Sequence, residues 1–327
     1  MQKKKINYGI VGTGHIGKYH IQQIQNIENI NLVGVFDVHT KLCNEIANEY
    51  KVRPFEKIES LLVKCDAISI ATPACSHYQV AKQALSAHCH VFIEKPITTN
   101  VQDAKKLISL SKKNNLLIQV GHIERFNPAL ATFKKKQKDI KPQFIETHRL
   151  APFNVRGTDT DVILDLMIHD IDLVLYLANS KVVDVVASGV SVLSNSLDMA
   201  NARISFDNGC VANLTASRIS DKPLRKLRVF EKSRYLSFDL QNNTYSEYLV
   251  KNNRRKTQTA KLVFEKDNKV VTMKKHVGEK TNALYEELLS FVNSIIKSQK
   301  VMVNAIDGKN AIEIALLVQK QINAQQK

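Results

Sequence analysis

The chain has 327 residues, of which 44% are hydrophobic and 24% are charged. This is the composition of a globular protein, and it excludes a disordered, collagen-like or coiled-coil chain. The length exceeds the usual size of one compact core, so we expect two domains rather than a single large α/β barrel.

The net charge is strongly positive, because 47 lysine and arginine residues outweigh 31 aspartate and glutamate residues to give +16. Such a charge attracts nucleic acid, anionic lipid or a phosphorylated small molecule over long distances. The positive residues are spread along the chain, and tryptophan is absent. A lysine-rich solvated surface is therefore favoured over a nucleic-acid site.

The cysteines form no C-x-x-C pair and no spacing typical of a zinc site; they are Cys43, Cys65, Cys75, Cys89 and Cys210. An odd, scattered set predicts reduced thiols in a cytoplasmic protein, with no bound metal. The sequence contains no run of about 18 apolar residues, so we expect no membrane span.

Short apolar runs rich in β-branched residues alternate with amphipathic stretches over the first third of the chain. The runs cover residues 6–11, 32–36, 67–71, 91–93 and 116–120. The amphipathic stretches, with apolar residues at helical spacing, cover residues 16–25, 41–50, 78–87 and 101–112. This alternation predicts a parallel sheet with crossover helices in a first domain of residues 1–122.

After Gly121 the pattern changes to that of a second domain, residues 123–327. Helical patterns cover residues 127–136, 161–178, 282–296 and 305–322. Strand patterns include residues 143–150, 182–192, 199–206, 210–218 and 234–239. We expect an α+β domain whose mostly antiparallel sheet carries helices on one face.

Gly12, Gly14 and Gly17 form a G-x-G-x-x-G sequence between the first predicted strand and the first predicted helix. The first glycine permits a tight turn, the second lets the backbone approach a pyrophosphate, and the third brings the helix close to the strand. The helix N-terminus, which begins with His15 and Ile16, presents free N–H groups to the phosphates. This context predicts a doubly wound Rossmann domain that binds a dinucleotide, and makes a chance glycine-rich turn the weaker alternative.

Asp37 stands at the end of the next predicted strand, twenty residues after Gly17. A carboxylate at this position accepts hydrogen bonds from the ribose hydroxyls of the cofactor and repels a 2′-phosphate. Residues 38–41 offer no arginine that would compensate that repulsion. The sequence therefore predicts NAD rather than NADP.

Thr72 and Pro73 follow the predicted strand 67–71, and His77 lies a few residues further on. Ligands of parallel sheets lie beyond the carboxyl ends of the strands, so we expect this segment to border the cofactor. For His77, a helix-capping or partly exposed histidine is at least as well supported as a cofactor contact.

The segment Glu94-Lys95-Pro96 ends the strand that begins at Val91, and Asp165 precedes His169 by four residues. The glycine motif, this E-K-P segment and the D-x-x-x-H segment together resemble the Gfo/Idh/MocA oxidoreductases over essentially the whole chain. The resemblance implies that Lys95 lies beside the nicotinamide and the substrate hydroxyl, with Glu94 at the cofactor. The proline fixes the turn and permits a cis peptide bond before it.

Asp165, His169 and Asp172 are spaced four and three residues apart, which places all three on one face of a helix. Polar groups among so many apolar residues need partners or a cleft. The resemblance implies that Asp165 and His169 face the substrate; a hydrogen-bonded core pair is the alternative. Family members often carry two glycines before this motif, where the chain has Thr160 and Asp161.

Residues 121–128 join the two predicted domains and are expected to line the cleft between them. Within the family, this segment and residues 164–172 are most similar to the branch that oxidises the 3-hydroxyl of UDP-N-acetylglucosamine and related UDP-sugars. Guanidinium groups bind diphosphate bidentately, and the predicted substrate contacts are Arg125, Asn127, Arg149 and Arg156. For Arg149 and Arg156, ion pairing within the protein is equally well supported.

We expect a cytoplasmic, NAD-dependent dehydrogenase that oxidises a sugar hydroxyl to a ketone by hydride transfer, acting on an anionic UDP-sugar. Lys95 and His169 are the two candidates for the base, and Asp165 orients His169 or holds a neighbouring hydroxyl.

Three alternatives remain open: a dehydrogenase of a free sugar, inositol or UDP-sugar acid; a non-catalytic NAD-binding sensor; and a basic nucleic-acid binder. The open-faced sheet of the family implies a homodimer or homotetramer.

Overall fold

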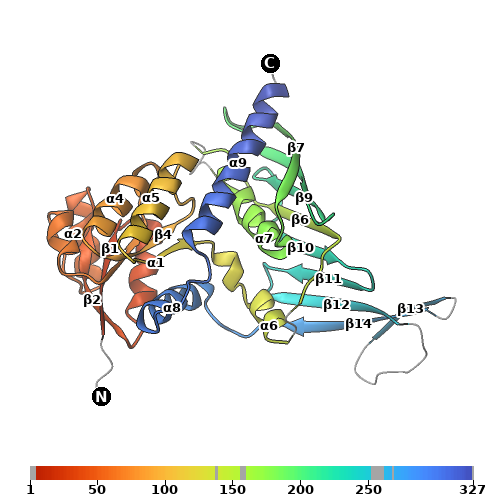
Figure 1. Cartoon of the computed structure of the whole chain (residues 1–327), viewed down its shortest axis with the longest axis horizontal. Helices are drawn as coiled ribbons and strands as arrows, with labels where there is room; N and C mark the ends of the chain where they lie inside the picture. The colour runs from red at the N-terminus through yellow and green to blue at the C-terminus, as the bar shows by residue number, and fades with distance from the viewer. Residues whose placement is uncertain (1–4, 137–138, 155–159, 252–260, 267–268, 326–327) are drawn as a thin grey trace. The chain divides into compact units, whose positions relative to one another are not determined.

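A computed structural model of the chain describes residues 5–136, 139–154, 160–251, 261–266 and 269–325. The chain divides into two compact units (Figure 1). Unit 1 comprises Met1–Ile123 and Asn282–Glu313, and unit 2 comprises Glu124–Thr281 and Ile314–Lys327. The chain first passes from unit 1 to unit 2 between Ile123 and Glu124, next to the expected domain boundary after residue 122. The expected second domain, 123–327, differs from unit 2 because Asn282–Glu313 packs with unit 1.

Unit 1 is built on a parallel sheet with the order β2-β1-β3-β4-β5. Its strands are β1 (Ile6–Val11), β2 (Ile30–Phe36), β3 (Ala67–Ile70), β4 (His90–Glu94) and β5 (Ile118–Gly121). An isolated parallel bridge between Val35 and Pro54 continues the sheet beyond β2. The strand order reverses between β1 and β3, and the carboxyl ends of these two strands therefore flank the crevice where such sheets bind ligands. The predicted Rossmann architecture is confirmed.

Helices cover both faces of this sheet, which explains the near-continuous apolar character of its strands. They are α1 (His15–Ile24), α2 (Thr40–Glu49), α3 (Ile58–Leu62), α4 (Ala74–Ser86), α5 (Val101–Lys113) and α8 (Ala283–Ile296). The Tyr8 ring packs edge-on against Phe291 of α8, at 6.4 Å between centroids. The backbone of the next strand residue, Gly9, lies against Leu61 of α3. Because successive strand residues point to opposite faces, α8 and α3 cover opposite sides of β1.

Helix α8 is the element whose placement the sequence pattern did not predict. Its apolar face, including Leu288, Phe291 and Val292, is fully buried in the core that α1, α2 and β1 form. Asn282 caps the helix by accepting hydrogen bonds from the backbone N–H groups of Leu284 and Tyr285. An amphipathic pattern predicts that a helix buries one face, but it does not say against which sheet.

Unit 2 contains a sheet with the order β13-β14-β12-β11-β10-β6-β9-β8-β7 among the described residues. Its strands are β6 (Phe144–Leu150), β7 (Val182–Val190), β8 (Met199–Phe206), β9 (Val211–Ser217), β10 (Leu224–Phe230), β11 (Arg234–Asp239), β12 (Thr244–Lys251), β13 (Lys261–Lys266) and β14 (Lys269–Val277). Only the β6–β9 pair is parallel among the described pairings. The predicted mostly antiparallel sheet is confirmed.

Two helices pack on one face of this sheet: α6 (Pro128–Lys136) on β11, β12 and β14, and α7 (Ile168–Ala178) on β6 and β9. Phe133 of α6 meets the rings of Phe238 and Tyr245 edge-on, at 5.5 and 5.6 Å between centroids. The last helix, α9 (Ala305–Gln325), has its residues from Ile314 onward in unit 2.

A row of half-buried aromatic rings crosses four neighbouring strands on the other face. It consists of Phe144, Phe230, Tyr235 and Tyr248, with successive centroids 5.9, 4.7 and 4.9 Å apart. Tyr235 lies three residues before Phe238 on β11, so the row faces away from α6. Within the described part of the chain, no helix combines the length and apolar character that crossing a membrane requires.

Candidate active site

The glycine loop after β1 has the geometry of a phosphate cradle. Gly12 has a φ of +97°, and a Cβ there would lie 2.6 Å from the carbonyl oxygen of Ala71. A Cβ on Gly17 would collide with the carbonyl oxygen of Gly12, whereas a Cβ on Gly14 would meet nothing within 4 Å. The open space at Gly14 admits a ligand close to the backbone, so the loop fits a dinucleotide pyrophosphate.

The N-terminus of α1 faces the same loop. The helix begins at His15, its N-cap is Gly14, and no side chain caps it. Its first turn, which includes Ile16, carries no acidic residue. Uncapped N–H groups at a helix N-terminus attract phosphate oxygens, so these residues suit the role that the sequence predicts for them.

Asp37 is fixed beside the glycine loop by three hydrogen bonds. Its Oδ2 accepts from the backbone N–H of Thr13 at 2.7 Å and from the Thr13 hydroxyl at 3.1 Å. Its Oδ1 accepts from the backbone N–H of His39 at 2.9 Å. The carboxylate is only partly buried, so lone pairs remain for a ribose. Thr13 was not predicted from the sequence as a residue of the site, although its position inside the glycine motif was a signal for it.

His77 connects the segments that follow β3 and β4. Its side chain is almost fully buried, with Nδ1 2.7 Å from the Pro96 carbonyl oxygen and Nε2 2.9 Å from the Thr72 carbonyl oxygen. Burial lowers the pKa of His77, against the opposing effects of the two carbonyls and of Glu94. Pro73 is the N-cap of α4. Because backbone carbonyls occupy both ring nitrogens, the geometry favours a role for His77 in holding this edge over direct cofactor contact.

Lys95 directly follows β4 and is linked to Pro96 by a cis peptide bond. The preceding residue, Glu94, accepts a hydrogen bond from His20 Nε2 at 2.9 Å. Burial alone would raise the pKa of Glu94, but the hydrogen bond from His20 and the charges of His20, Lys95 and His77 together lower it. Lys95 therefore follows a carboxylate that is held in its charged form.

In unit 2, the expected single helix 161–178 consists of a capping residue, a π-helical segment η2 (Ile163–Met167) and α7. Asp161 Oδ1 accepts hydrogen bonds from the N–H groups of Ile163 and Leu164, both at 3.0 Å. Asp161 thus starts the helix with a side-chain cap. Asp165 lies within η2, and the half-buried His169 is the second residue of α7. Such π-helical segments frequently occur at functional sites.

Asp172, three residues after His169, is almost fully buried in an ion pair with Arg125. Arg125 donates from Nε to Asp172 Oδ2 at 2.7 Å and from Nη2 to Oδ1 at 2.6 Å. Its guanidinium group also lies over the Tyr176 ring, 4.6 Å from the centroid. For Arg125, this geometry favours the positioning of α7 over the substrate contact expected from the sequence.

Arg149 is likewise almost fully buried between two carboxylates. It donates from Nε and Nη2 to Asp170 at 3.0 and 2.9 Å, and from Nη1 to Glu124 Oε1 at 2.9 Å. Burial alone would lower the pKa of Arg149, but the charges of Asp170 and Glu124 raise it. Of the two roles left open for Arg149, the geometry favours the ion pair.

Asn127, also expected at the substrate, caps α6. Its Oδ1 accepts from the Ala129 N–H at 3.0 Å, and its Nδ2 donates to the Leu240 carbonyl oxygen at 3.0 Å. This hydrogen bonding favours a structural role. Arg156 lies outside the described residues. No group of three or more histidine, cysteine, aspartate or glutamate side chains in the described residues could hold a metal ion.

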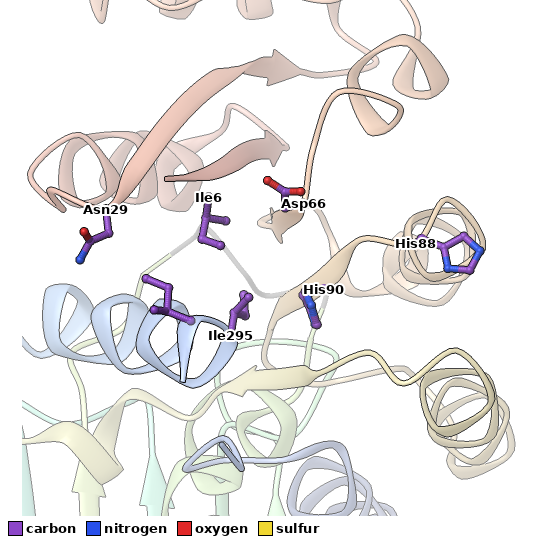
Figure 2. Close-up of a pocket in the computed structure, with 7 residues that line it drawn as sticks. Ile6, Asn29, Asp66, His88, His90 and Ile295 are labelled. Atoms are coloured by element: carbon purple, nitrogen blue, oxygen red, sulfur yellow. The ribbon is translucent and has the colours of Figure 1, made fainter. Parts of the chain in front are cut away.

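A pocket of about 330 Å³ in unit 1 lies away from the glycine loop and Lys95 (Figure 2). It is lined by Ile6, Asn29, Asp66, His88, His90, Ile295 and Ile296. Ile6 and His90 are the first residues of β1 and β4, so the pocket opens at the amino ends of the strands. The glycine loop and Lys95 follow the carboxyl ends of the same strands, at the opposite edge of the sheet.

Two family models match the sequence. Residues 6–122 match the Gfo/Idh/MocA model for an oxidoreductase family with an NAD-binding Rossmann fold. Residues 145–232 match the model of a Gfo/Idh/MocA C-terminal domain. The two matches fall within unit 1 and unit 2, respectively.

Similar proteins match the chain over nearly its whole length. The chain is 37% identical over 316 residues to UDP-N-acetylglucosamine 3-dehydrogenase of Acidithiobacillus ferrooxidans, and the match covers 97% of each chain. It is 25% identical over 337 residues to myo-inositol 2-dehydrogenase of Thermotoga maritima, covering 96% of this chain and 95% of that one. The solved structure of UDP-N-acetylglucosamine 3-dehydrogenase GnnA from A. ferrooxidans has a TM-score of 0.88 at 36% identity, covering 98% of each chain.

Proposed function

The chain belongs to the Gfo/Idh/MocA family of NAD-binding oxidoreductases, and from this premise we propose that it oxidises the 3-hydroxyl of UDP-N-acetylglucosamine, or of a closely related UDP-sugar, to a ketone. The reaction class and the cofactor follow from the family and from the cradle around Gly14. The identity of the substrate as a UDP-sugar is what the proposal adds to them.

The observation that carries the proposal is the position of Lys95. It follows β4 at the edge of the sheet to which the glycine loop also belongs, and it directly follows the charged Glu94. A reactive side chain beside the nicotinamide end of a dinucleotide is what a dehydrogenase needs and what a non-catalytic NAD sensor does not. The 37% identity to a UDP-N-acetylglucosamine 3-dehydrogenase supports the choice of substrate.

The chemistry divides between cofactor and protein. When bound, NAD supplies the acceptor for the hydride that leaves the carbinol carbon. The protein takes the hydroxyl proton, for which Lys95 Nζ and a ring nitrogen of His169 are the two candidates. Asp165 orients His169 or holds a neighbouring sugar hydroxyl. The residues that would hold the cofactor are those of the glycine loop and α1 N-terminus, Asp37 and the segments after β3 and β4.

The test is a panel of UDP-sugars and free sugars supplied with NAD, with reduced nicotinamide followed by absorbance. Because oxidation of a sugar hydroxyl is uphill, an aminotransferase that consumes the ketone should be added, and mass spectrometry should identify the product. Reduction of NAD with UDP-N-acetylglucosamine is expected. Without the aminotransferase the product should be a ketone two mass units lighter than the substrate, and with the aminotransferase and its amino donor it should be an amine one mass unit lighter. Tight NAD binding without turnover on any sugar would instead support the sensor.

A second candidate is the oxidation of inositol or a free sugar, which the 25% identity to a myo-inositol 2-dehydrogenase supports. The dependence of substrate binding on salt concentration distinguishes the two candidate substrates. A UDP-sugar drawn to a protein of charge +16 binds more weakly as ionic strength rises, whereas a neutral polyol does not. The Michaelis constant of each accepted substrate at low and high salt, on the same enzyme preparation, makes the comparison.

We further propose a homodimer or homotetramer in the cytoplasm. The half-buried aromatic row on the open face of the unit 2 sheet supports self-association, because an apolar sheet face gains by excluding water. The five cysteines are all free, which suits a reducing compartment. Light scattering of wild type and Tyr235→Lys tests the association: the variant should have the smaller mass.

A further inference from the structure

A chain of four polar side chains runs through the interior of unit 1 and ends at Glu94. The Tyr8 hydroxyl lies 2.8 Å from Ser69 Oγ, and Ser69 Oγ lies 3.0 Å from His20 Nδ1. His20 Nε2 lies 2.9 Å from Glu94 Oε1. The four residues come from β1, β3, α1 and β4, so the chain crosses from the middle of the sheet to its carboxyl edge.

The direction of these hydrogen bonds follows from the end at Glu94. A carboxylate only accepts, so His20 Nε2 must donate. In a neutral imidazole the other nitrogen then accepts from the Ser69 hydroxyl, and in a protonated imidazole it donates to Ser69 Oγ. The Ser69 oxygen in turn accepts from Tyr8, whose pKa burial raises and which therefore stays a donor. Each donor has one acceptor, and all of them support a negative charge on Glu94.

Tyr8, Ser69 and His20 are fully buried, which defines what the chain can do. A serine, a histidine and a carboxylate in contact resemble a nucleophilic arrangement, but no substrate reaches Ser69 Oγ. The surroundings are apolar: the ring of Phe92 packs edge-on against His20 at 5.3 Å between centroids. Burying polar groups in an apolar core is costly even when they are paired. An apolar set of the same shape would serve packing better, so the polar chain serves Glu94.

Four groups border the partly buried Glu94 carboxylate or act on it electrostatically. His20 donates to it from α1, and the charge of the adjacent Lys95, together with that of His77 from α4 when His77 is protonated, acts on it. On β5, the register partner of Glu94 is Gly121, where a Cβ would lie 2.9 Å from Oε2. The glycine leaves the space in which the carboxylate sits. Glu94, the residue directly before Lys95, is thus held in one position and in its charged form.

We propose that His20 is a positioning residue for Lys95: it holds the Glu94 carboxylate as an anion in one orientation, and the anion in turn holds the Lys95 amino group at the carboxyl end of β4. The inference rests on the proposed function in one respect, namely that Lys95 acts at the reacting hydroxyl. The effect of the Glu94 carboxylate on the protonation of the Lys95 amine does not depend on any substrate. A carboxylate next to an amine favours the charged amine, so loss of the anion leaves more free amine at a given pH.

The first test measures the Lys95 amine itself. Full-length protein, with and without NAD, is labelled briefly with acetic anhydride at neutral pH, and peptide mass spectrometry gives the rate at Lys95 relative to the exposed Lys64. In Glu94→Gln the relative rate should rise about 3- to 10-fold, which corresponds to a pKa lower by about half to one unit. His20→Leu should show a rise in the same direction. His20→Gln keeps a donor for Glu94 and should stay within about twofold of wild type.

The matched control is His90→Leu. His90 is the first residue of β4, the strand that ends at Glu94, and like His20 it uses a ring nitrogen for a hydrogen bond, accepting from the Leu117 N–H at 2.9 Å. It lies at the opposite, amino edge of the sheet, in the pocket of Figure 2. His90→Leu should lose thermal stability without changing the relative labelling of Lys95. Unchanged labelling in both folded Glu94→Gln and folded His20→Leu would overturn the proposal, as would a His90→Leu variant that matches His20→Leu.

The second test uses turnover on whichever sugar the panel identifies. His20→Leu should lower kcat about tenfold or more, leave the KM for NAD within a few-fold, and move the acidic limb of the pH profile to lower pH; His20→Gln should recover most of the rate. Equal losses in His20→Gln and His20→Leu would indicate a purely structural role. If wild type oxidises no sugar, the proposed function fails, while the labelling series still decides the role of His20.

Discussion

Arg125 and Asp172 form a bidentate ion pair in which both side chains are almost fully buried, with N···O distances of 2.7 and 2.6 Å. Asp172 lies on α7 three residues after His169, and Arg125 lies in the 3₁₀ segment η1 (Ile123–Phe126). A second buried pair, Arg149 with Asp170, holds the same helix turn. The helix that carries His169 is therefore anchored by two arginines that the sequence offered as candidate substrate contacts, with ion pairing equally well supported for Arg149.

Arg125→Ala should destabilise the protein strongly. Removing one partner of a buried ion pair leaves an uncompensated charge, which typically costs about 3–5 kcal/mol. The measurement is the free energy of unfolding in urea. Lys135→Ala is the control, because Lys135 and Glu279 form an exposed pair, for which about 0–1 kcal/mol is expected. Similar, small losses of unfolding free energy in both variants, together with a weaker apparent affinity for substrate in Arg125→Ala, would instead support a direct contact between Arg125 and the substrate.

Wild type should bind NAD more tightly than NADP by about 1–2 kcal/mol or more, because Asp37 would meet a 2′-phosphate with like charge. Asp37→Ser should reduce this difference in binding free energy, because it weakens the binding of NAD and relieves the repulsion of NADP. Calorimetry with both reduced cofactors measures the two affinities. Thr13→Val, which keeps the backbone N–H bond to Asp37 and removes only the hydroxyl bond, should keep the preference. Equal affinities in wild type would contradict the assigned role of Asp37.

Lys95→Met and His169→Ala should each abolish most turnover and leave NAD affinity within a few-fold, because neither side chain belongs to the pyrophosphate cradle. Rates at saturating substrate and calorimetry with NADH separate the two effects. Of the two variants, the one that loses the acidic limb of the pH profile identifies the base. A collapse of NADH binding in both would show that the residues support the fold instead.

Acidification should reduce stability through His77. Its folded-state pKa is lowered by burial, so below the ordinary value near 6.5 the unfolded chain binds more protons and the folded state loses stability. The slope from one such group is at most about 1.4 kcal/mol per pH unit. Unfolding in urea between pH 7.5 and roughly 5.5 should give a shallower slope for His77→Gln than for wild type. Parallel slopes would remove His77 as the titrating group; His90, whose pKa is also lowered by burial, would then be tested.

Local chemistry settled much of unit 1 from the sequence. The glycine at position 12 was readable because a φ of +97° is a property of one residue and its immediate turn. The start of α5 is equally local, because the Asn100 side chain accepts a hydrogen bond from the Asp103 N–H. Alternating strand and helix patterns then imply parallel strands, so the position of Lys95 at a carboxyl edge followed without coordinates.

Only the tertiary structure decided which polar groups form hydrogen bonds and ion pairs with each other. Arg125 finds Asp172 at a separation of 47 residues, and His20 finds Ser69 and Glu94 at separations of 49 and 74. A signal for His20 was present, since a histidine stands on the otherwise apolar face of α1. The sequence shows that such a group needs a partner, but the packing of distant elements selects it. For the same reason only the fold could assign α8 to unit 1, because an apolar helix face is compatible with any apolar sheet.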